Sequence, residues 1–238
     1  MAGKLYVIGV GPGDPELLTL KAVRILEDVK VLCVPKAKEG SDSIALSVVK
    51  DVLSLEHKEI MEARFPMKKP GNRENRRTLE AAWRNTVKTI TSRLEAGADV
   101  AFLTIGDPTL YSTFFHLYDK LLEAHPDLNI EIIPGVSSIT AAASRARISL
   151  GLADEKIAIL PAPYADDLKE ILEQFDSVVL MKVHKVIDRV MGLLEEMGLA
   201  DHATYIAKVG MDDEVICRDI GKVGEEEGHY LSMVIVRK

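Results

Sequence analysis

Short apolar runs, each followed by a turn rich in glycine or proline, recur along the chain. The clearest runs cover residues 5–10 and 100–103, and a more polar strand-like run covers residues 129–133. Runs of this length without polar alternation are typical of strands that are buried on both faces of a parallel sheet. Between them, residues 16–28 and 74–96 carry apolar side chains at helical spacing. The pattern therefore predicts an α/β architecture.

The second half of the chain changes character. Residues 156–160 and 177–183 again predict strands separated by a helix. The last three strand-like runs cover residues 204–209, 214–220 and 230–237, and short polar turns join them. Short connections of this kind favour antiparallel pairing. We expect two α/β domains, residues 1–115 with a mostly parallel sheet and residues 116–238 with a mixed sheet that includes antiparallel strands.

Three of the predicted strands end in turns with unusual sequences. GVGPGDP covers residues 9–15, TIGDP covers residues 104–108, and PGVSS covers residues 134–138. Glycine lets a ligand approach the backbone closely, and proline stops the strand. Because ligands of open α/β sheets bind beyond the carboxyl ends of the strands, these turns are the candidate binding elements.

A dinucleotide-binding turn is the first alternative for the amino-terminal glycines, and the residues oppose it. Gly9, Gly11 and Gly13 do not have the GxGxxG spacing. Asp14 would place a negative charge at the start of the helix, where a pyrophosphate should bind. No acidic residue follows the second strand to bind a ribose hydroxyl, since that strand ends in Pro35 and Lys36.

Composition excludes several other classes. A net charge of −7 argues against a general nucleic-acid binder, and no apolar run is long enough to span a bilayer. Cys33 and Cys217 form no CxxC pair, which favours a reducing cytoplasm. The six histidines show no HxH or HxxxH spacing, so we expect no protein metal site.

One segment departs from the acidic background. Residues 62–77 hold only two acidic side chains but six basic ones. The basic residues are Arg64, Lys68, Lys69, Arg73, Arg76 and Arg77. Two prolines and a glycine predict a loop over its first half. The segment is either a solvated loop or a basic lid over a polyanionic ligand, and the sequence favours neither.

Taken together in this order and at these separations, the three turns resemble those of the tetrapyrrole methylase family. Enzymes of this family use S-adenosylmethionine in corrin and sirohaem synthesis. The resemblance covers essentially the whole chain, and the runs LTLKAVRIL, TIGDPTLYSTF and IPGVSSITAAA look most like the branch that methylates the C-20 meso carbon of precorrin-2 or cobalt-factor II. It implies two α/β domains, S-adenosylmethionine in a cleft between them, and a homodimer.

The resemblance also implies which positions contact the cofactor. They are Pro12, Ile105, Gly106, Asp107, Leu110, Ser137, Ser138, Met181, Val209 and Gly210. Asp107 would offer its carboxylate to the methionine part, and Val209 and Gly210 would flank the adenine. Ile105 replaces a second glycine of the sirohaem-branch enzymes, and Ser137-Ser138 replaces Thr-Ala, so the sirohaem reaction is disfavoured.

The chemistry implied by the resemblance needs little covalent help. Methyl transfer from a sulfonium is an in-line displacement, and catalysis is mostly positioning. The substrate ring carries many carboxylates, so basic residues are expected to bind it, namely Lys36, Arg64, Lys68 and Arg73. Tyr111, His116 and Glu62 are alternatives for a base that removes the meso proton.

Other functions stay open at this point. The same fold could methylate another corrin carbon or a diphthine precursor, or could carry a ligand without catalysis. An NAD-dependent oxidoreductase is the remote alternative. The sequence does not distinguish a metal-free ring from a cobalt-loaded one.

Overall fold

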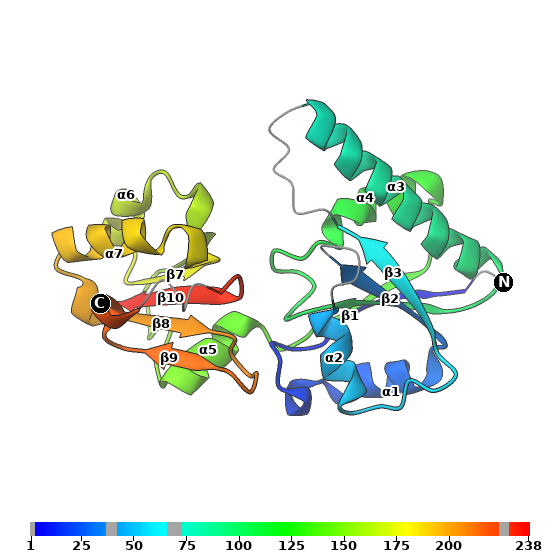
Figure 1. Ribbon diagram of the computed structural model, residues 1–238, viewed down its shortest axis with the longest axis horizontal. Helices are drawn as coiled ribbons and strands as arrows, with labels where there is room; N and C mark the ends of the chain where they lie inside the picture. Colours follow the sequence, from blue (N-terminus) through cyan, green and yellow to red (C-terminus); the bar gives the residue numbers. More distant parts are fainter. Residues whose placement is uncertain (1–2, 37–41, 66–72, 224–228) are drawn as a thin grey trace. The chain divides into compact units, whose positions relative to one another are not determined.

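The computed structural model describes residues 3–36, 42–65, 73–223 and 229–238 (Figure 1). The chain divides into two compact units, Met1–Ser137 and Ser138–Lys238. The sequence placed the boundary near residue 115. The structure places it after Ser137, because the helix and the strand that follow residue 115 pack and pair within the first unit.

The first unit contains one five-stranded sheet in the order β3-β2-β4-β1-β5, and every pairing in it is parallel. Its strands are β1 (Leu5–Gly9), β2 (Val31–Lys36), β3 (Glu59–Arg64), β4 (Val100–Thr104) and β5 (Ile130–Ile133). Every residue of β4 is buried, as its continuous apolar run predicted. The predicted parallel sheet is thus confirmed.

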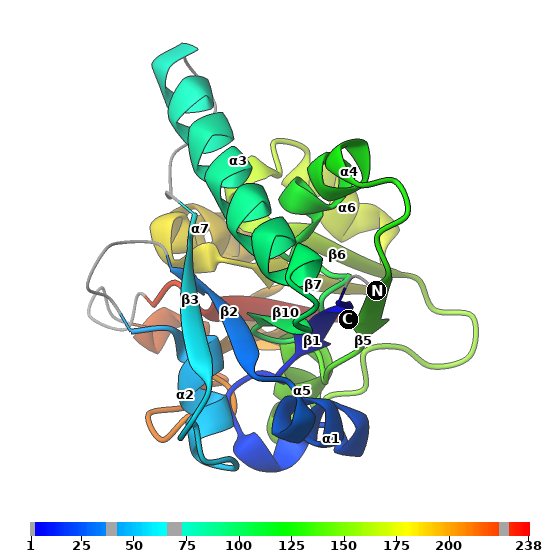
Figure 2. The same ribbon diagram turned by 90° about the vertical axis from the view of Figure 1, so that its right-hand side faces the viewer.

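Helices cover both faces of this sheet (Figure 2). They are α1 (Leu20–Asp28), α2 (Ile44–Lys50), α3 (Arg73–Glu95) and α4 (Phe115–Ala124), and the short η1 (Pro15–Leu17) precedes α1. Phe102 of β4 points into the core that α3 and α4 close, and its neighbour Leu103 points into the core that α1 and α2 close. Alternate residues of one strand therefore anchor opposite helical layers.

Two local predictions in this unit were wrong in detail. Residues 59–64, of which 62–64 fell in the predicted loop, form the edge strand β3, in which Met61 and Ala63 are buried and the other four residues are exposed. Charged side chains on the exposed face of an edge strand hid the apolar pattern. The first predicted helix is split, because Asp14 caps only the short η1 and Thr19 caps α1 by accepting from Ala22 N–H at 3.2 Å.

Apolar side chains of α3, including Leu79, Ile90 and Leu94, lie on one buried face. Trp83, within the predicted amphipathic helix, is partly buried and packs against the hydrophobic core that includes Ile90 and Leu94. Charged side chains fill the remaining surface of this 23-residue helix. No helix among the described residues, α3 included, combines the length and the apolar character needed to cross a membrane.

A mixed sheet in the order β6-β7-β10-β8-β9 forms the second unit. β6 and β7 are parallel, and the other pairings are antiparallel, as predicted. The strands are β6 (Ile157–Pro161), β7 (Ser177–Met181), β8 (Ala203–Ala207), β9 (Val215–Cys217) and β10 (Ser232–Arg237). Helices α6 (Leu168–Gln174) and α7 (Ile187–Glu196) close the main core, and α5 (Ser138–Ala146) packs on β8.

An ion-pair cluster on β5 predicts how the stability of the first unit depends on pH. Glu131 accepts hydrogen bonds from Lys21 and Lys4, and these bonds lower its pKa from 4.5 to about 2. Because the pKa is lower in the folded state, the carboxylate stabilises the fold above pH 4.5, and this stabilisation is lost as the pH falls towards 2. Glu131→Gln should therefore lower the urea midpoint at about pH 7, and the difference should narrow towards about pH 3.

Urea unfolding followed by circular dichroism at both pH values measures this difference. Glu123→Gln, at an exposed position of α4, is the control and should leave the midpoint unchanged at either pH. A Glu131→Gln difference of the same size at both pH values would contradict the role of the ion pairs.

Candidate functional site

The three glycine-containing turns meet at one edge of the first sheet. They follow β1, β4 and β5, and these strands are neighbours in the order β4-β1-β5. Because the pairing is parallel, the carboxyl ends of all three strands lie at the same edge. Segments that are far apart in the sequence thus form one site, and we call them the first, second and third bend (residues 10–15, 105–111 and 134–137).

Backbone contacts join the first bend to the second. Gly106 N–H donates to the Gly11 carbonyl oxygen at 2.7 Å, and Val10 N–H donates to the Thr104 carbonyl oxygen at 2.9 Å. Gly11 and Gly106 have φ angles of +79° and +72°, which side-chain-bearing residues rarely adopt. Glycine is therefore needed at both positions for the two bends to pair.

At the third bend the chains approach even more closely. A Cβ atom placed on Gly9, the last residue of β1, would lie 2.6 Å from the Gly106 carbonyl oxygen, 2.7 Å from Gly135 N and 2.8 Å from Pro108 Cδ. A Cβ atom on Gly135 would lie 2.8 Å from the carbonyl carbon of Gly9. Gly9 thus lies where all three bends touch, and no larger residue fits there.

Asp107 fastens the second bend to the third. Its Oδ2 accepts a hydrogen bond from Gly135 N–H at 3.1 Å. Its Oδ1 accepts from Thr109 N–H at 2.8 Å and from the Thr109 hydroxyl. The sequence assigned this carboxylate to the ligand, whereas the structure shows it bonded to protein donors. A contact between Asp107 and a cofactor stays a prediction.

The other predicted cofactor residues of the first unit belong to the same bends. Pro12 is buried in the first bend, and Ile105 and Leu110 are half-buried in the second. Ser137 ends the third bend, and Ser138 begins α5 in the second unit. The structure therefore brings Pro12, Ile105, Gly106, Asp107, Leu110 and Ser137 to one edge of the parallel sheet.

In the second unit the predicted residues gather at the carboxyl ends of β7 and β8. Met181 is the last residue of β7, and Val209 and Gly210 follow β8. Gly210 has a φ of +78°, and its N–H donates to Glu214 Oε2 at 2.8 Å. Glu214 also accepts from Arg145 Nε at 2.9 Å, which ties this turn to α5.

Sequence reasoning missed the two side chains that fix these turns. Thr109 holds the Asp107 carboxylate, and the Asp-x-Thr spacing of an Asx-type turn was the available signal. Glu214, four residues after Gly210, accepts a hydrogen bond from Gly210 N–H. No sequence motif indicates this contact, because the two residues lie in a polar turn without a recognisable pattern.

The residues predicted to bind substrate are placed in part. Lys36 and Arg64 are register partners at the ends of β2 and β3, and Arg73 is the exposed first residue of α3. Lys36 Nζ donates to Glu62 Oε1 at 2.5 Å, so its charge is partly balanced within the protein. Lys68 lies outside the described residues, as do residues 66–72 of the proposed lid.

The three candidates for a base have different surroundings. Glu62 is engaged by Lys36, and the His116 ring stacks on Trp83 with centroids 5.0 Å apart and an interplanar angle of 7°. Tyr111 ends the second bend with a φ of +53°, and 46% of its surface is exposed. Among the three, Tyr111 alone is part of a bend.

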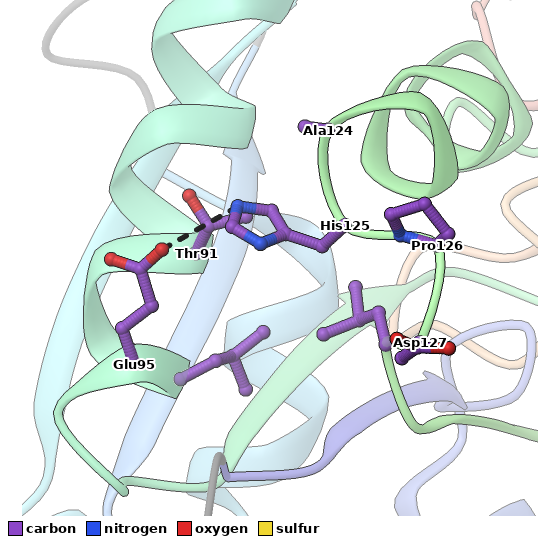
Figure 3. Close-up of a pocket in the computed structure, with 8 residues that line it drawn as sticks. Thr91, Glu95, Ala124, His125, Pro126 and Asp127 are labelled. Carbon is purple, nitrogen blue, oxygen red and sulfur yellow. Dashed lines mark ion pairs between the residues drawn. The ribbon is translucent and has the colours of Figure 1, made fainter.

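A pocket of about 250 Å³ lies elsewhere in the first unit, between α3 and the segment that follows α4 (Figure 3). His125 Nε2 lies 3.6 Å from Glu95 Oε1 across it, and Thr91 and Asp127 add polar atoms. The lining segments precede β4 and β5, so the pocket is at the amino ends of the strands. The bends lie at the opposite ends, and the pocket is not part of the site.

Residues 4–223 match the model of the family described as Tetrapyrrole (Corrin/Porphyrin) Methylases.

Three full-length relatives are similar to this chain. The cobalt-precorrin-2 C(20)-methyltransferase of Salmonella typhimurium is 36% identical, over 100% of this chain and 98% of the relative. A probable enzyme of the same name from Methanocaldococcus jannaschii is 35% identical, over 99% and 96%. The precorrin-2 C(20)-methyltransferase of a Sinorhizobium species is 29% identical, over 98% and 95%.

Solved structures share the fold at lower identity. The cobalt precorrin-4 methyltransferase CbiF has a TM-score of 0.75 at 22% identity, covering 98% of this chain and 94% of that one. The uroporphyrin-III C-methyltransferase of Thermus thermophilus, solved with S-adenosylhomocysteine, has a TM-score of 0.67 at 21% identity, covering 99% and 92%.

Proposed function

This chain belongs to the tetrapyrrole methylase family, and on that premise we propose that it transfers a methyl group from S-adenosylmethionine to the C-20 meso carbon of a corrin precursor in cobalamin biosynthesis. The observation that carries the proposal is full-length similarity to C(20)-methyltransferases at up to 36% identity. Neither an oxidoreductase nor a diphthine-type methylase is favoured by these relatives.

The ring that we propose as substrate contains cobalt. Both relatives named for the cobalt form are more similar to this chain, at 36% and 35%, than the relative named for metal-free precorrin-2, at 29%. The metal belongs to the substrate, so this preference requires no metal ligand from the protein.

The packing of the three bends supports a shared cofactor site. Glycine at residues 9, 11, 106 and 135 lets the backbones of the bends pack against one another, so that the predicted contact residues are held at one edge of the sheet. The proposed cofactor contacts are those predicted from the sequence, and the solved relative with S-adenosylhomocysteine supports the class of cofactor.

The proposed mechanism relies on positioning. When bound, S-adenosylmethionine supplies an electrophilic methyl group, whose carbon–sulfur electron pair stays with sulfur while the ring carbon forms the new bond. The residues of the three bends would hold the donor for this transfer, and positioning of this kind can lower the barrier by about 7 kcal/mol or more. Tyr111 is our choice among the three candidates because it ends the second bend, and it would accept the meso proton as the phenolate.

We also propose that the protein works as a cytoplasmic homodimer. Both cysteines, Cys33 and Cys217, are free, and burial raises the pKa of Cys33 to about 12, so that it stays a protonated thiol. Free thiols suit a reducing compartment. Light scattering of the purified protein tests the dimer, and a monomer at working concentrations would contradict it.

Two assays test the proposed function. Calorimetry should detect binding of S-adenosylhomocysteine and none of NADH. Incubation with cobalt-factor II and a labelled methyl donor, followed by mass spectrometry, should show one added methyl group at C-20, with faster turnover than on precorrin-2. Labelling of another carbon, or of neither ring, would overturn the proposal.

Arg64 at the end of β3 and Arg73 at the start of α3 lead to a prediction about substrate affinity. Reversing Arg64 and Arg73 to glutamate should raise KM for the ring about tenfold or more, because each reversal turns an attraction to ring carboxylates into a repulsion. The double reversal of the exposed Lys30 and Lys50, in the same unit, is the control. Steady-state kinetics at low salt measures the effect, and equal KM values for both variants would argue for a solvated loop.

A further inference from the structure

Two lysines in the second unit have the same unusual backbone conformation. Lys182 follows β7 with a φ of +60°, and Lys208 follows β8 with a φ of +52°. The strand between β7 and β8 is β10. Lys182 N–H donates to the Ser232 carbonyl oxygen at 2.7 Å, and Lys208 N–H donates to the Leu231 carbonyl oxygen at 2.8 Å. The start of β10 is therefore held between two lysines, whose backbone strain is typical of functional positions.

The side chains of these lysines have different surroundings. Lys208 Nζ forms an ion pair with Asp213. Lys182 Nζ lies over the ring of Tyr230, 5.9 Å from its centroid. Burial lowers the pKa of Lys182 and raises the pKa of Tyr230, so both polar ends are held in a partly dehydrated environment. A charge-assisted hydrogen bond from an ammonium to a carboxylate is stronger in such a place than in water.

Two histidines complete the surroundings of Tyr230. His184 meets the Tyr230 ring edge-on, with centroids 5.5 Å apart, and His229 Nδ1 accepts from Leu231 N–H at 3.1 Å. Burial lowers the pKa of both imidazoles, and the charges of Lys185 and Lys208 lower them further. Both shifts favour the uncharged imidazole, so the lysines are the main source of positive charge at this edge.

We propose that Lys182, held over Tyr230, binds one carboxylate of the tetrapyrrole ring and so orients the ring for methylation. The inference rests on the proposed function and adds a residue that recognises its substrate. Lys182 directly follows Met181, a predicted cofactor position, so a carboxylate bound here belongs to a molecule next to the methyl donor. The predicted contacts of the donor's methionine part are Ile105, Gly106 and Asp107 of the first unit, which favours the ring as the source of a carboxylate bound by Lys182.

Lys182→Met tests the proposal, because it keeps the length of the side chain and removes the charge. Fluorescence titration with uroporphyrin III, a soluble carboxylated ring, measures ring binding, and calorimetry measures S-adenosylhomocysteine binding. We expect ring binding to weaken about tenfold and cofactor binding to stay within about twofold. The slope of ring affinity against salt should also fall, since one charge contact is lost.

Lys185→Gln is the matched control. It removes the same charge three residues away, from an exposed side chain, and should leave ring affinity within about twofold of the parent. Lys182→Arg should restore most of the ring affinity, because it returns the charge.

Each outcome decides between the hypotheses. Ring affinity of Lys182→Met equal to that of Lys185→Gln overturns the inference and leaves the methyltransferase assignment intact. Weaker cofactor binding with unchanged ring binding also overturns it, because the carboxylate would then belong to the donor. If Lys182→Met selectively loses ring binding but the parent protein methylates no tetrapyrrole, the ring-binding site is supported and the proposed methyltransferase function is contradicted.

Discussion

Replacing Gly9 with alanine should unfold the first unit at lower denaturant and abolish cofactor binding. The added Cβ would lie within 2.8 Å of the Gly106 carbonyl oxygen, Gly135 N and Pro108 Cδ, which are backbone or ring atoms that cannot rotate away. Separating the bends to relieve this overlap should cost about 3 kcal/mol, at the upper end of overpacking effects. Urea unfolding and calorimetry with S-adenosylhomocysteine measure the two losses.

Gly192→Ala is the control for this prediction. Gly192 lies inside α7, and a Cβ placed there would meet nothing within 4 Å. Alanine loses less backbone entropy than glycine on forming a helix, so this variant should gain up to about 1 kcal/mol. A Gly9→Ala protein with parental stability and cofactor affinity would show that the bends do not need to touch.

The second large effect should come from Asp107→Ala. This change removes the acceptor for Gly135 N–H, Thr109 N–H and the Thr109 hydroxyl, so the second and third bends lose their shared fastening. Hydrogen bonds to a charged group contribute about 1.5–3 kcal/mol each, and partial exposure reduces the total. We expect a loss of about 2–3 kcal/mol in stability. Under the proposed function we also expect a fall of about 100-fold or more in kcat/KM, because the donor loses its alignment.

Thr109→Val is the control that distinguishes loss of the Asp107 hydrogen bond to the third bend from a general disturbance of the turn. It removes one hydroxyl donor and keeps the backbone N–H that Asp107 accepts at 2.8 Å, so it should cost about 1 kcal/mol or less. Urea unfolding and steady-state kinetics compare the two variants. If Asp107→Ala loses turnover while its unfolding midpoint stays at the parental value, the carboxylate acts on the ligand rather than on the bends.

Strands buried on both faces were the part of the fold that could be predicted most directly. β1 and β4 have continuous apolar runs that carry their own signal, and the glycine turns after them identified the site. The edge strand β3 was missed, because Glu62 and Arg64 alternate with its two buried residues. The end of the first unit was misplaced because pairing of β5 with β1 is a long-range contact, which no local pattern records.

The sequence by itself determined the architecture, the three bends and the resemblance to the family. A short apolar run indicates a buried strand, and a glycine indicates a tight turn, so both can be recognised from neighbouring residues alone. Only the tertiary structure decided that Gly9 lies where the bends touch and that Asp107 fastens Gly135. It alone brought Lys182 over Tyr230. These contacts join residues that are far apart in the chain, and parallel and antiparallel strand pairing, which sets their distances, depends on the whole sheet.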